Sequence, residues 1–217
     1  MAVRTAFSSR ADGDLRVGGD PAALEARRAR LAPHPWTWLH QVHGADVVVV
    51  TRPGEHAGAA ADASVTAVPG AVLAVQTADC AAVLLADAEA GVVGAAHAGW
   101  RGLAGGVLQR TVSAMHSIGA RDISAVLGPC IRVGCYEFGA EELDRVVASL
   151  GEVVRGTTMW GAGGFDVAAG VRHVLGALGV RSLDEVGGCT ACDPDRWFSH
   201  RARGEVERLA AVTWIEP

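Results

Sequence analysis

The segment TADCAAVLLADAEAGVVGAAHAGWRG, residues 77–102, decides how the fold of this chain is interpreted. Its two apolar runs, Ala81–Ala86 and Val92–Ala96, are typical of buried strands. Between them lies the turn-rich sequence DAEAG, residues 87–91. We therefore expect the two runs to pair as one antiparallel hairpin, with the chemistry-bearing residues of the segment gathered at its open end.

This hairpin brings a thiol toward an imidazole. If Ala86 pairs with Val92 across the turn, Cys80 lies opposite Ala98. That position is next to His97, and directly opposed Cβ atoms of an antiparallel pair are about 4.5–5.5 Å apart. A thiolate beside an imidazole is typical of a metal site or of a Cys/His catalytic pair.

Composition limits the classes of protein that fit. The 217 residues are 50% hydrophobic and 20% charged, which predicts one globular domain spanning residues 1–217. The formal net charge of −5 argues against nucleic-acid binding. No stretch approaches the roughly 20 apolar residues of a membrane span, and no secretory signal is visible. Five cysteines without an export signal indicate reduced thiols, metal ligands or a nucleophile, so we expect a cytoplasmic location.

Elsewhere the pattern alternates between strands and helices. Asp20 and Pro21 predict the start of a helix that runs to Leu31. Further strands are expected at Trp36–His40, Val47–Thr51, Ala71–Gln76, Asp122–Leu127 and Leu209–Ile215, and further helices from Leu103 through Met115, at Glu141–Leu150, and between Asp166 and Gly179. Hairpins mixed with helices predict an α+β layered fold with mixed β-sheets.

Three candidate metal ligands, His43, Cys80 and His97, stand beside predicted strand ends. Two His and one Cys leave one position of a tetrahedral Zn²⁺ open, as catalytic zinc sites do. That position can hold a water molecule or a substrate oxygen. The alternative is that both histidines are hydrogen-bonded core residues and Cys80 is a small buried hydrophobe. The residues alone leave both interpretations open.

A glycine-rich turn follows His97 and contains Arg101. Backbone N–H groups at a helix start attract anions, but the glycine spacing matches neither a dinucleotide fingerprint nor a Walker loop. A tight turn explains the glycines equally well. Arg101 is the better evidence for an anion, because a guanidinium binds phosphate or carboxylate through two parallel hydrogen bonds.

The other four cysteines form two pairs, Cys189-x-x-Cys192 and the looser Cys130 and Cys135. Together they would make a four-thiolate structural zinc site, although the second spacing is unusual for one. A thioredoxin-like redox motif is disfavoured, because this CxxC lies in a late loop and not at the start of a helix.

Five blocks occur in a characteristic order: QVHGADV (41–47), ADC (78–80), HAGWRG (97–102), GPCI (128–131) and CYE (135–137). This series resembles the laccase-domain family, also called the multicopper polyphenol oxidase or peptidoglycan-editing-factor family, whose bacterial members include zinc-containing purine nucleoside phosphorylases. The N-terminal FSSR and the C-terminal CT and FS pairs extend the resemblance over nearly the whole chain.

The resemblance implies that His43, Cys80 and His97 are zinc ligands. It implies a layered α/β/β/α fold like that of cysteine-hydrolase-like toxins. It also implies cleavage of adenosine, inosine and methylthioadenosine with phosphate, with adenosine deamination at the same site. His200 stands where the family often has Tyr, and the N-terminal glycine-rich turn is shortened to residues 11–13. These departures affect the expected rim of the substrate pocket and leave the metal ligands intact.

The implied reaction needs positive charge for phosphate, and we expect Arg101 and Arg10 to supply it, with Gln41 in the same substrate pocket. Deamination also needs a proton shuttle, for which Asp62 and Asp79 are the candidates. Asp79, next to Cys80, could instead orient a metal-bound histidine or stabilise a turn. For Cys80 itself the rival role is that of a covalent nucleophile.

Three other functions remain as alternatives. A copper-dependent polyphenol oxidase would place copper where zinc is expected, but oxygen-reducing copper sites use many histidines and the chain has eight. A zinc hydrolase that edits peptidoglycan precursors would use the same metal on an amide bond. A non-catalytic binding module is disfavoured by a ligand set with an open position. The expected partners are a purine nucleoside and phosphate, without a prediction of oligomeric state.

Overall fold

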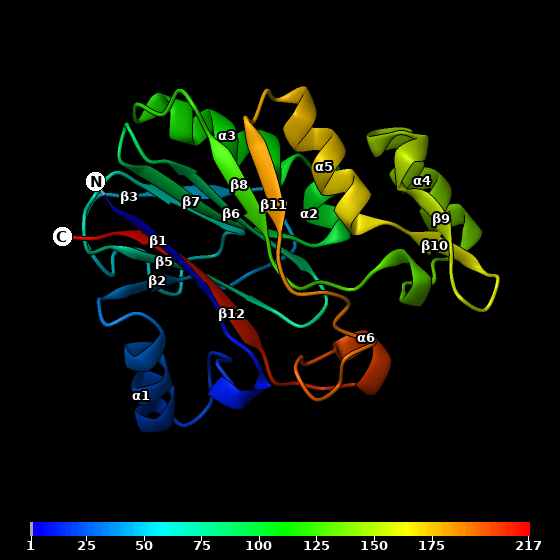
Figure 1. The fold of residues 1–217 in the computed structure, drawn as a ribbon, viewed down its shortest axis with the longest axis horizontal. Coiled ribbons are helices and arrows are strands. Elements are labelled where there is room, and N and C mark those ends of the chain that lie inside the picture. Colours follow the sequence, from blue (N-terminus) through cyan, green and yellow to red (C-terminus); the bar gives the residue numbers. More distant parts are fainter. Residues whose placement is uncertain (1) are drawn as a thin grey trace.

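Two β-sheets pack face to face in the computed structural model, which describes residues 2–217 (Figure 1). The smaller sheet has the order β1 (Val3–Phe7), β12 (Leu209–Ile215), β5 (Val72–Thr77), β2 (Trp36–Trp38). The larger sheet has the order β11 (Ser182–Glu185), β8 (Ser124–Leu127), β6 (Ala81–Asp87), β7 (Val92–Ala98), β4 (Ala63–Thr66), β3 (Val47–Val50). Both sheets contain parallel and antiparallel pairs, as expected.

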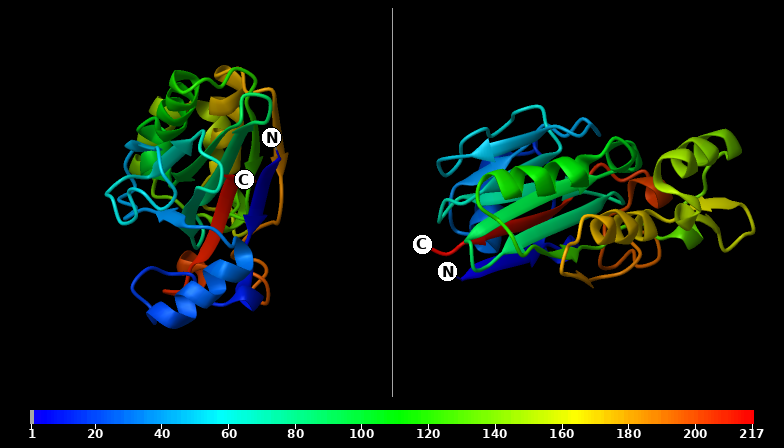
Figure 2. Two further views of the ribbon diagram at one scale, coloured as in Figure 1. Left: turned by 90° about the vertical axis from the view of Figure 1, so that its left-hand side faces the viewer. Right: turned by 90° about the horizontal axis from the view of Figure 1, so that it is seen from above.

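Helices cover the outer faces of both sheets. Helix α1 (Pro21–Leu31) lies below the smaller sheet, and α3 (Val107–Ser117) and α5 (Val167–Ala177) lie above the larger one (Figure 2, left). The remaining elements are the helices α2 (Trp100–Ala104), α4 (Ala140–Leu150) and α6 (His200–Arg203), the strands β9 (Arg155–Thr157) and β10 (Gly163–Phe165), and the 3-10 turns Arg10–Asp12, Val133–Cys135 and Glu152–Val154. No helix within residues 2–217 is long and apolar enough to cross a membrane. The predicted α/β/β/α layering is confirmed.

The core follows the alternation of side chains along the strands. In the β6–β7 hairpin, Leu84 and Val93 pack between the two sheets, while Val83 and Leu85 pack under the helices of the larger sheet. A third cluster buries Leu24 of α1 against the outer face of the smaller sheet. Because β6 and β7 are covered on both faces, their sequences are continuous apolar runs and do not alternate with polar residues.

The hairpin pairs with a register one residue away from the expected one. The ladder joins Asp87 to Val92, so the expected pair Ala86–Val92 is wrong. The Asp87 carboxylate accepts hydrogen bonds from two N–H groups of the following loop, at 2.9 and 3.1 Å, which favours a four-residue connection. Since side chains alternate between faces, this one-residue shift directs Cys80 to the same face as His97.

The helix expected from Leu103 through Met115 is divided into α2 and α3. Gly106, at φ +88°, adopts a left-handed conformation that a glycine reaches without strain and starts α3 with a new direction. Five strands were not expected: β1, β4, β9, β10 and β11. Of these, β4 is the one that matters for function, because it lies between β3 and β7 and directly follows Asp62.

Candidate active site

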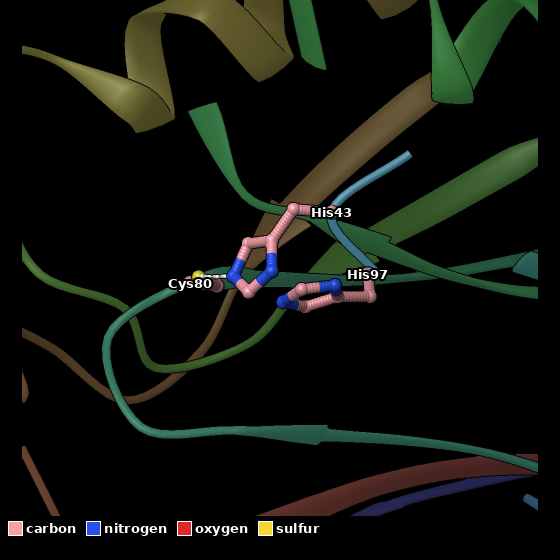
Figure 3. A group of neighbouring side chains, drawn as sticks. All are labelled: His43, Cys80 and His97. Atoms are coloured by element: carbon pink, nitrogen blue, oxygen red, sulfur yellow. Dashed lines mark hydrogen bonds between the residues drawn. The ribbon is translucent and has the colours of Figure 1, made fainter. Parts of the chain in front are cut away.

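His43, Cys80 and His97 meet at the open end of the β6–β7 hairpin (Figure 3). Their potential ligand atoms all lie within 4.8 Å of one another. Cys80 Sγ is 3.8 Å from His43 Nε2, and the two imidazole rings are 4.9 Å apart in an edge-to-face arrangement. His43 comes from the loop before β3, Cys80 from the residue before β6, and His97 from β7. The structure therefore brings the three predicted ligands together.

A buried carboxylate orients two of these residues. Asp62 accepts a hydrogen bond from His97 Nδ1 at 2.8 Å, which leaves the Nε2 lone pair of His97 available to a metal ion. The same carboxylate accepts hydrogen bonds from the backbone N–H groups of Val42, His43 and Gly44 at 3.2, 2.9 and 2.7 Å. One carboxylate thus fixes both an imidazole and the loop that carries the other imidazole.

The loop held by Asp62 has an unusual backbone. His43 has φ +58°, in the left-handed region that favours glycine. Such a conformation costs free energy and persists only where the surroundings determine it strongly. The three hydrogen bonds that Asp62 accepts from backbone N–H groups are such a constraint. Strain at a ligand, stabilised by a buried charge, is the pattern expected of a functional position.

Two glycines of the HAGWRG block allow the close approach of the ligands. A Cβ on Gly99 would lie 2.7 Å from His43 Cδ2 and 3.2 Å from Cys80 Sγ. A Cβ on Gly102 would lie 2.6 Å from the carbonyl oxygen of Gly44. Close packing against the ligand loops therefore explains these glycines. Of the two interpretations of the glycine-rich turn, anion binding and a tight turn, the structural one is supported.

Asp79 fixes the position of Cys80 from the other side. It has φ +103° and accepts hydrogen bonds from Thr190 Oγ1 at 2.6 Å, Ser199 Oγ at 2.7 Å and the Arg201 N–H at 2.6 Å. These contacts attach the C-terminal segment to the corner before β6. The carboxylate that contacts the ligand histidines is Asp62, so of the two roles considered for Asp79 the stabilisation of a turn fits and the orientation of a histidine does not.

Cys80 and His97 form a thiolate–imidazolium pair. Burial alone would raise the pKa of Cys80, but the charge of His97 and the hydrogen bond from His43 lower it to about 6. Burial alone would lower the pKa of His97, but the Cys80 thiolate and the hydrogen bond to Asp62 raise it to about 9. A thiolate and two imidazoles held by a carboxylate fit a Zn²⁺ ion, which would take the place of the imidazolium proton.

A cavity of about 430 Å³ opens beside the three ligands. Gln41 lines it, as expected, and its amide group pairs with the backbone of Gln76 through two 2.7 Å hydrogen bonds. The cavity is also lined by His200, at the expected rim, and by two arginines that the sequence analysis did not identify, Arg16 and Arg208. Arg16 lies outside any recognisable motif, and the only signal for Arg208 is that it directly precedes the last strand.

The two arginines expected to bind phosphate lie outside the lining of this cavity. Arg10 bonds to Glu205 and to the carbonyl of Trp197 at 3.1 Å, and its guanidinium stacks on the Phe198 ring. Arg101 is exposed, with its guanidinium 4.2 Å from the centre of the Trp100 ring. Among the described residues, the arginines that line this cavity together with His43, Cys80 and His97 are therefore Arg16 and Arg208.

Comparisons with known proteins identify the family of this chain. The family model described as multi-copper polyphenol oxidoreductase laccase matches residues 3–216. A Mycobacterium tuberculosis protein named purine nucleoside phosphorylase is 45% identical over 208 residues, covering 92% of this chain and 82% of the relative. One from Deinococcus radiodurans with the same name is 40% identical over 232 residues, covering 98% and 89%.

Solved structures of related proteins share the fold of this chain. The crystal structure of a Neisseria meningitidis protein of the DUF152 family superposes with a TM-score of 0.87 at 32% identity, covering 99% of this chain and 95% of that one. The structure of YlmD from Geobacillus stearothermophilus gives a TM-score of 0.80 at 28% identity, covering 99% and 91%. The match over nearly the full length in both sequence and fold shows that this chain belongs to the multi-copper polyphenol oxidoreductase laccase family.

Proposed function

We propose that this protein is a zinc-dependent purine nucleoside phosphorylase, which cleaves the bond between a purine and its ribose with phosphate. The observation that carries the proposal is that the His43–Cys80–His97 cluster and two arginines border one cavity of about 430 Å³. That volume lies within the roughly 300–1,000 Å³ of small-molecule sites. The names of the two relatives support the same reaction.

Phosphate binding is the first task of the site. In phosphorolysis a phosphate oxygen forms a bond to the anomeric carbon of ribose while the bond to the purine breaks and its electron pair leaves with the base. Arg16 and Arg208 are suited to hold the phosphate, because guanidinium groups pair with two oxygens at once. This assignment replaces Arg10 and leaves Arg101 as an outer contributor, because neither of them lines the cavity.

The zinc ligands are the second part of the proposal. His43, Cys80 and His97 would hold the ion, which when bound supplies a Lewis acid facing the substrate. Asp62 keeps the proton of His97 on Nδ1 and so keeps Nε2 directed at the ion. His200 lines the cavity, and its Nδ1–H donates to the carbonyl of Glu205 at 3.2 Å, so Nε2 would give a proton to the leaving purine from the imidazolium form, in which both ring nitrogens are protonated.

The proposed substrates are adenosine, inosine and methylthioadenosine. Deamination of adenosine at the same site belongs to the proposal as a second activity. The proton shuttle that it needs is assigned to His200 and not to Asp62 or Asp79, since both carboxylates are buried and engaged by hydrogen bonds.

The decisive experiment follows the products from inosine in zinc-loaded protein with and without phosphate. Equal amounts of hypoxanthine and ribose 1-phosphate, formed only with phosphate, are expected. The R16Q and R208Q variants should each raise the KM for phosphate about 10- to 100-fold, since each loses a hydrogen bond between charged groups, while the KM for inosine changes less. The control is R181Q, which removes an exposed arginine paired with Asp122. Hypoxanthine release that is independent of phosphate contradicts the proposal.

A second candidate is favoured by the donor set and the family description. One Cys and two His also suit copper, and the family model is described as a polyphenol oxidoreductase. Oxidation of a phenol by O₂ at such a site would predict oxygen uptake after copper loading. That measurement, made on the same preparation as the inosine assay, separates the two functions.

A further inference from the structure

A second cluster of thiols lies apart from the candidate active site. Cys135 ends the 3-10 turn Val133–Cys135, and Cys189 and Cys192 belong to the CxxC turn before α6. The three sulfur atoms lie within 4.8 Å of one another, with 3.3 Å between Cys135 and Cys192, which are 57 residues apart. Tertiary structure therefore gathers three thiols from two distant turns.

The backbone supports a thiolate at Cys189 and closes both turns that carry the three cysteines. The Arg132 N–H donates to Cys189 Sγ at 3.4 Å. The Cys192 N–H donates to the carbonyl of Cys189 at 3.2 Å and closes the CxxC turn, while the Cys135 N–H donates to the carbonyl of Arg132 at 2.8 Å and closes the other turn. Two tight turns thus face each other, each with a cysteine directed at the cluster, and an N–H···S bond stabilises a thiolate.

We propose that Cys135, Cys189 and Cys192 form a second metal site that binds Zn²⁺ through three thiolates. Thiolates are soft ligands that select Zn²⁺ among the common divalent ions, and Zn–S bonds of about 2.3 Å in a tetrahedron place sulfur atoms roughly 3.8 Å apart. The observed separations, from 3.3 Å to at most 4.8 Å, bracket that value. On binding, each coordinating thiol releases its proton to the solvent.

The surroundings of the cluster complete the site. Cys135 borders a separate cavity of about 510 Å³, which leaves room for water as the fourth ligand. Arg201, Glu137 and Glu142 line the same cavity. Cys130, which the sequence analysis grouped with these cysteines, is buried and lies outside the cluster, so the four-thiolate site is corrected to one of three.

The position of this site suggests a structural role close to the active site. Thr190, next to Cys189, donates a 2.6 Å hydrogen bond to Asp79, and Asp79 directly precedes Cys80. A metal ion that joins Cys135 to the CxxC turn would restrain the segment that holds Asp79. Zinc at the second site would therefore stabilise the corner on which the first site depends.

Metal stoichiometry of the whole protein, purified under reducing conditions and loaded with Zn²⁺, tests the proposal. We expect two zinc ions per chain in the unaltered protein. The variant C80A removes a ligand of the first cluster and should keep one ion. The double variant C135S/C192S should lose the second ion and keep the first. The control C130A removes a thiol outside both clusters and should keep two.

Cobalt titration of C80A identifies the ligands directly. Co²⁺ bound by this variant should show an intense thiolate-to-cobalt charge-transfer band, and thermal unfolding should shift to higher temperature with added Zn²⁺. Both effects should be absent from C80A/C135S/C192S. The proposal is overturned if reduced C80A takes up no Co²⁺, if the uptake survives in the triple variant, or if the reduced protein holds only one zinc ion. A purified protein with a Cys135–Cys192 disulfide that takes up no second ion after reduction also overturns it.

Discussion

The His43–Cys80–His97 cluster and the Cys135–Cys189–Cys192 cluster both join residues distant in sequence, but they are held in different ways. In the first, a ligand with a strained backbone is fixed by the buried carboxylate of Asp62, and the ligands border a cavity with basic side chains. In the second, short turns direct sulfur atoms at one another near the surface. Mixed ligands, strain and an adjoining cavity are expected of a reactive centre, whereas sulfur alone in tight turns is expected of a structural one.

Asp79 connects the two clusters. It directly precedes Cys80 in the chain, and its carboxylate accepts a hydrogen bond from Thr190, which is next to Cys189. The comparison therefore leads to three predictions. The first concerns a difference in reactivity between the thiols of the two clusters, the second a substitution that weakens the first cluster alone, and the third a substitution that weakens both clusters.

The largest expected effect is a difference in thiol reactivity. In metal-free, reduced protein Cys80 should react with iodoacetamide with an inflection near pH 6, because the pKa of its thiol is lowered to about 6 and the thiolate fraction rises as pH passes through the pKa. Burial and the neighbouring thiol of Cys192 raise the pKa of Cys135 to about 12, so Cys135 should react more than about 100-fold more slowly at pH 7.

Mass spectrometry of the peptides, taken over a range of pH, measures both rates at once. Zinc should protect Cys80. If Cys80 and Cys135 showed the same pH profile, the electrostatic difference between the clusters would be wrong.

The next effect in size is expected from D62N. The substitution removes the carboxylate that accepts hydrogen bonds from His97 Nδ1 and from the backbone of the His43 loop. Loss of such a hydrogen-bond partner lowers metal affinity about 10- to 100-fold. Zinc titration in the C135S/C192S background measures the first cluster alone. The matched control is D87N, a buried carboxylate at the opposite end of the same hairpin that bonds to backbone N–H groups, and it should leave zinc affinity unchanged.

The smallest of the three effects is expected from D79N. An amide replaces a carboxylate that accepts three short hydrogen bonds, so the free energy of unfolding should fall by about 2 kcal/mol. Urea unfolding measures this change. The exposed Asp195 offers the control D195N, which should stay within about 0.5 kcal/mol of the unaltered protein. Zinc binding that weakened at only one cluster in D79N would contradict the proposed connection.

Local patterns predicted much of the framework. Helix α1 has the predicted bounds Pro21–Leu31 and the predicted Asp20 cap, and β12 runs over Leu209–Ile215 as expected. The short β4 strand was missed because its four residues include Ser64 and Thr66, whose polar side chains are buried among neighbouring strands. The motifs around His43, Cys80 and His97 predicted three candidate ligands, and the structure places these side chains together.

Pairing across the fold decided what those patterns left open. The hairpin register depends on one carboxylate in the turn, and a shift of a single residue reverses the face of every side chain. Asp62 is 35 residues from His97, and Arg16 and Arg208 reach the cavity from loops near opposite ends of the chain. The sequence by itself indicated most of the element types, the three candidate ligands and the family. Only the tertiary structure decided which charges surround the triad and which cysteines gather, because burial and long-range hydrogen bonds leave no periodic trace in the sequence.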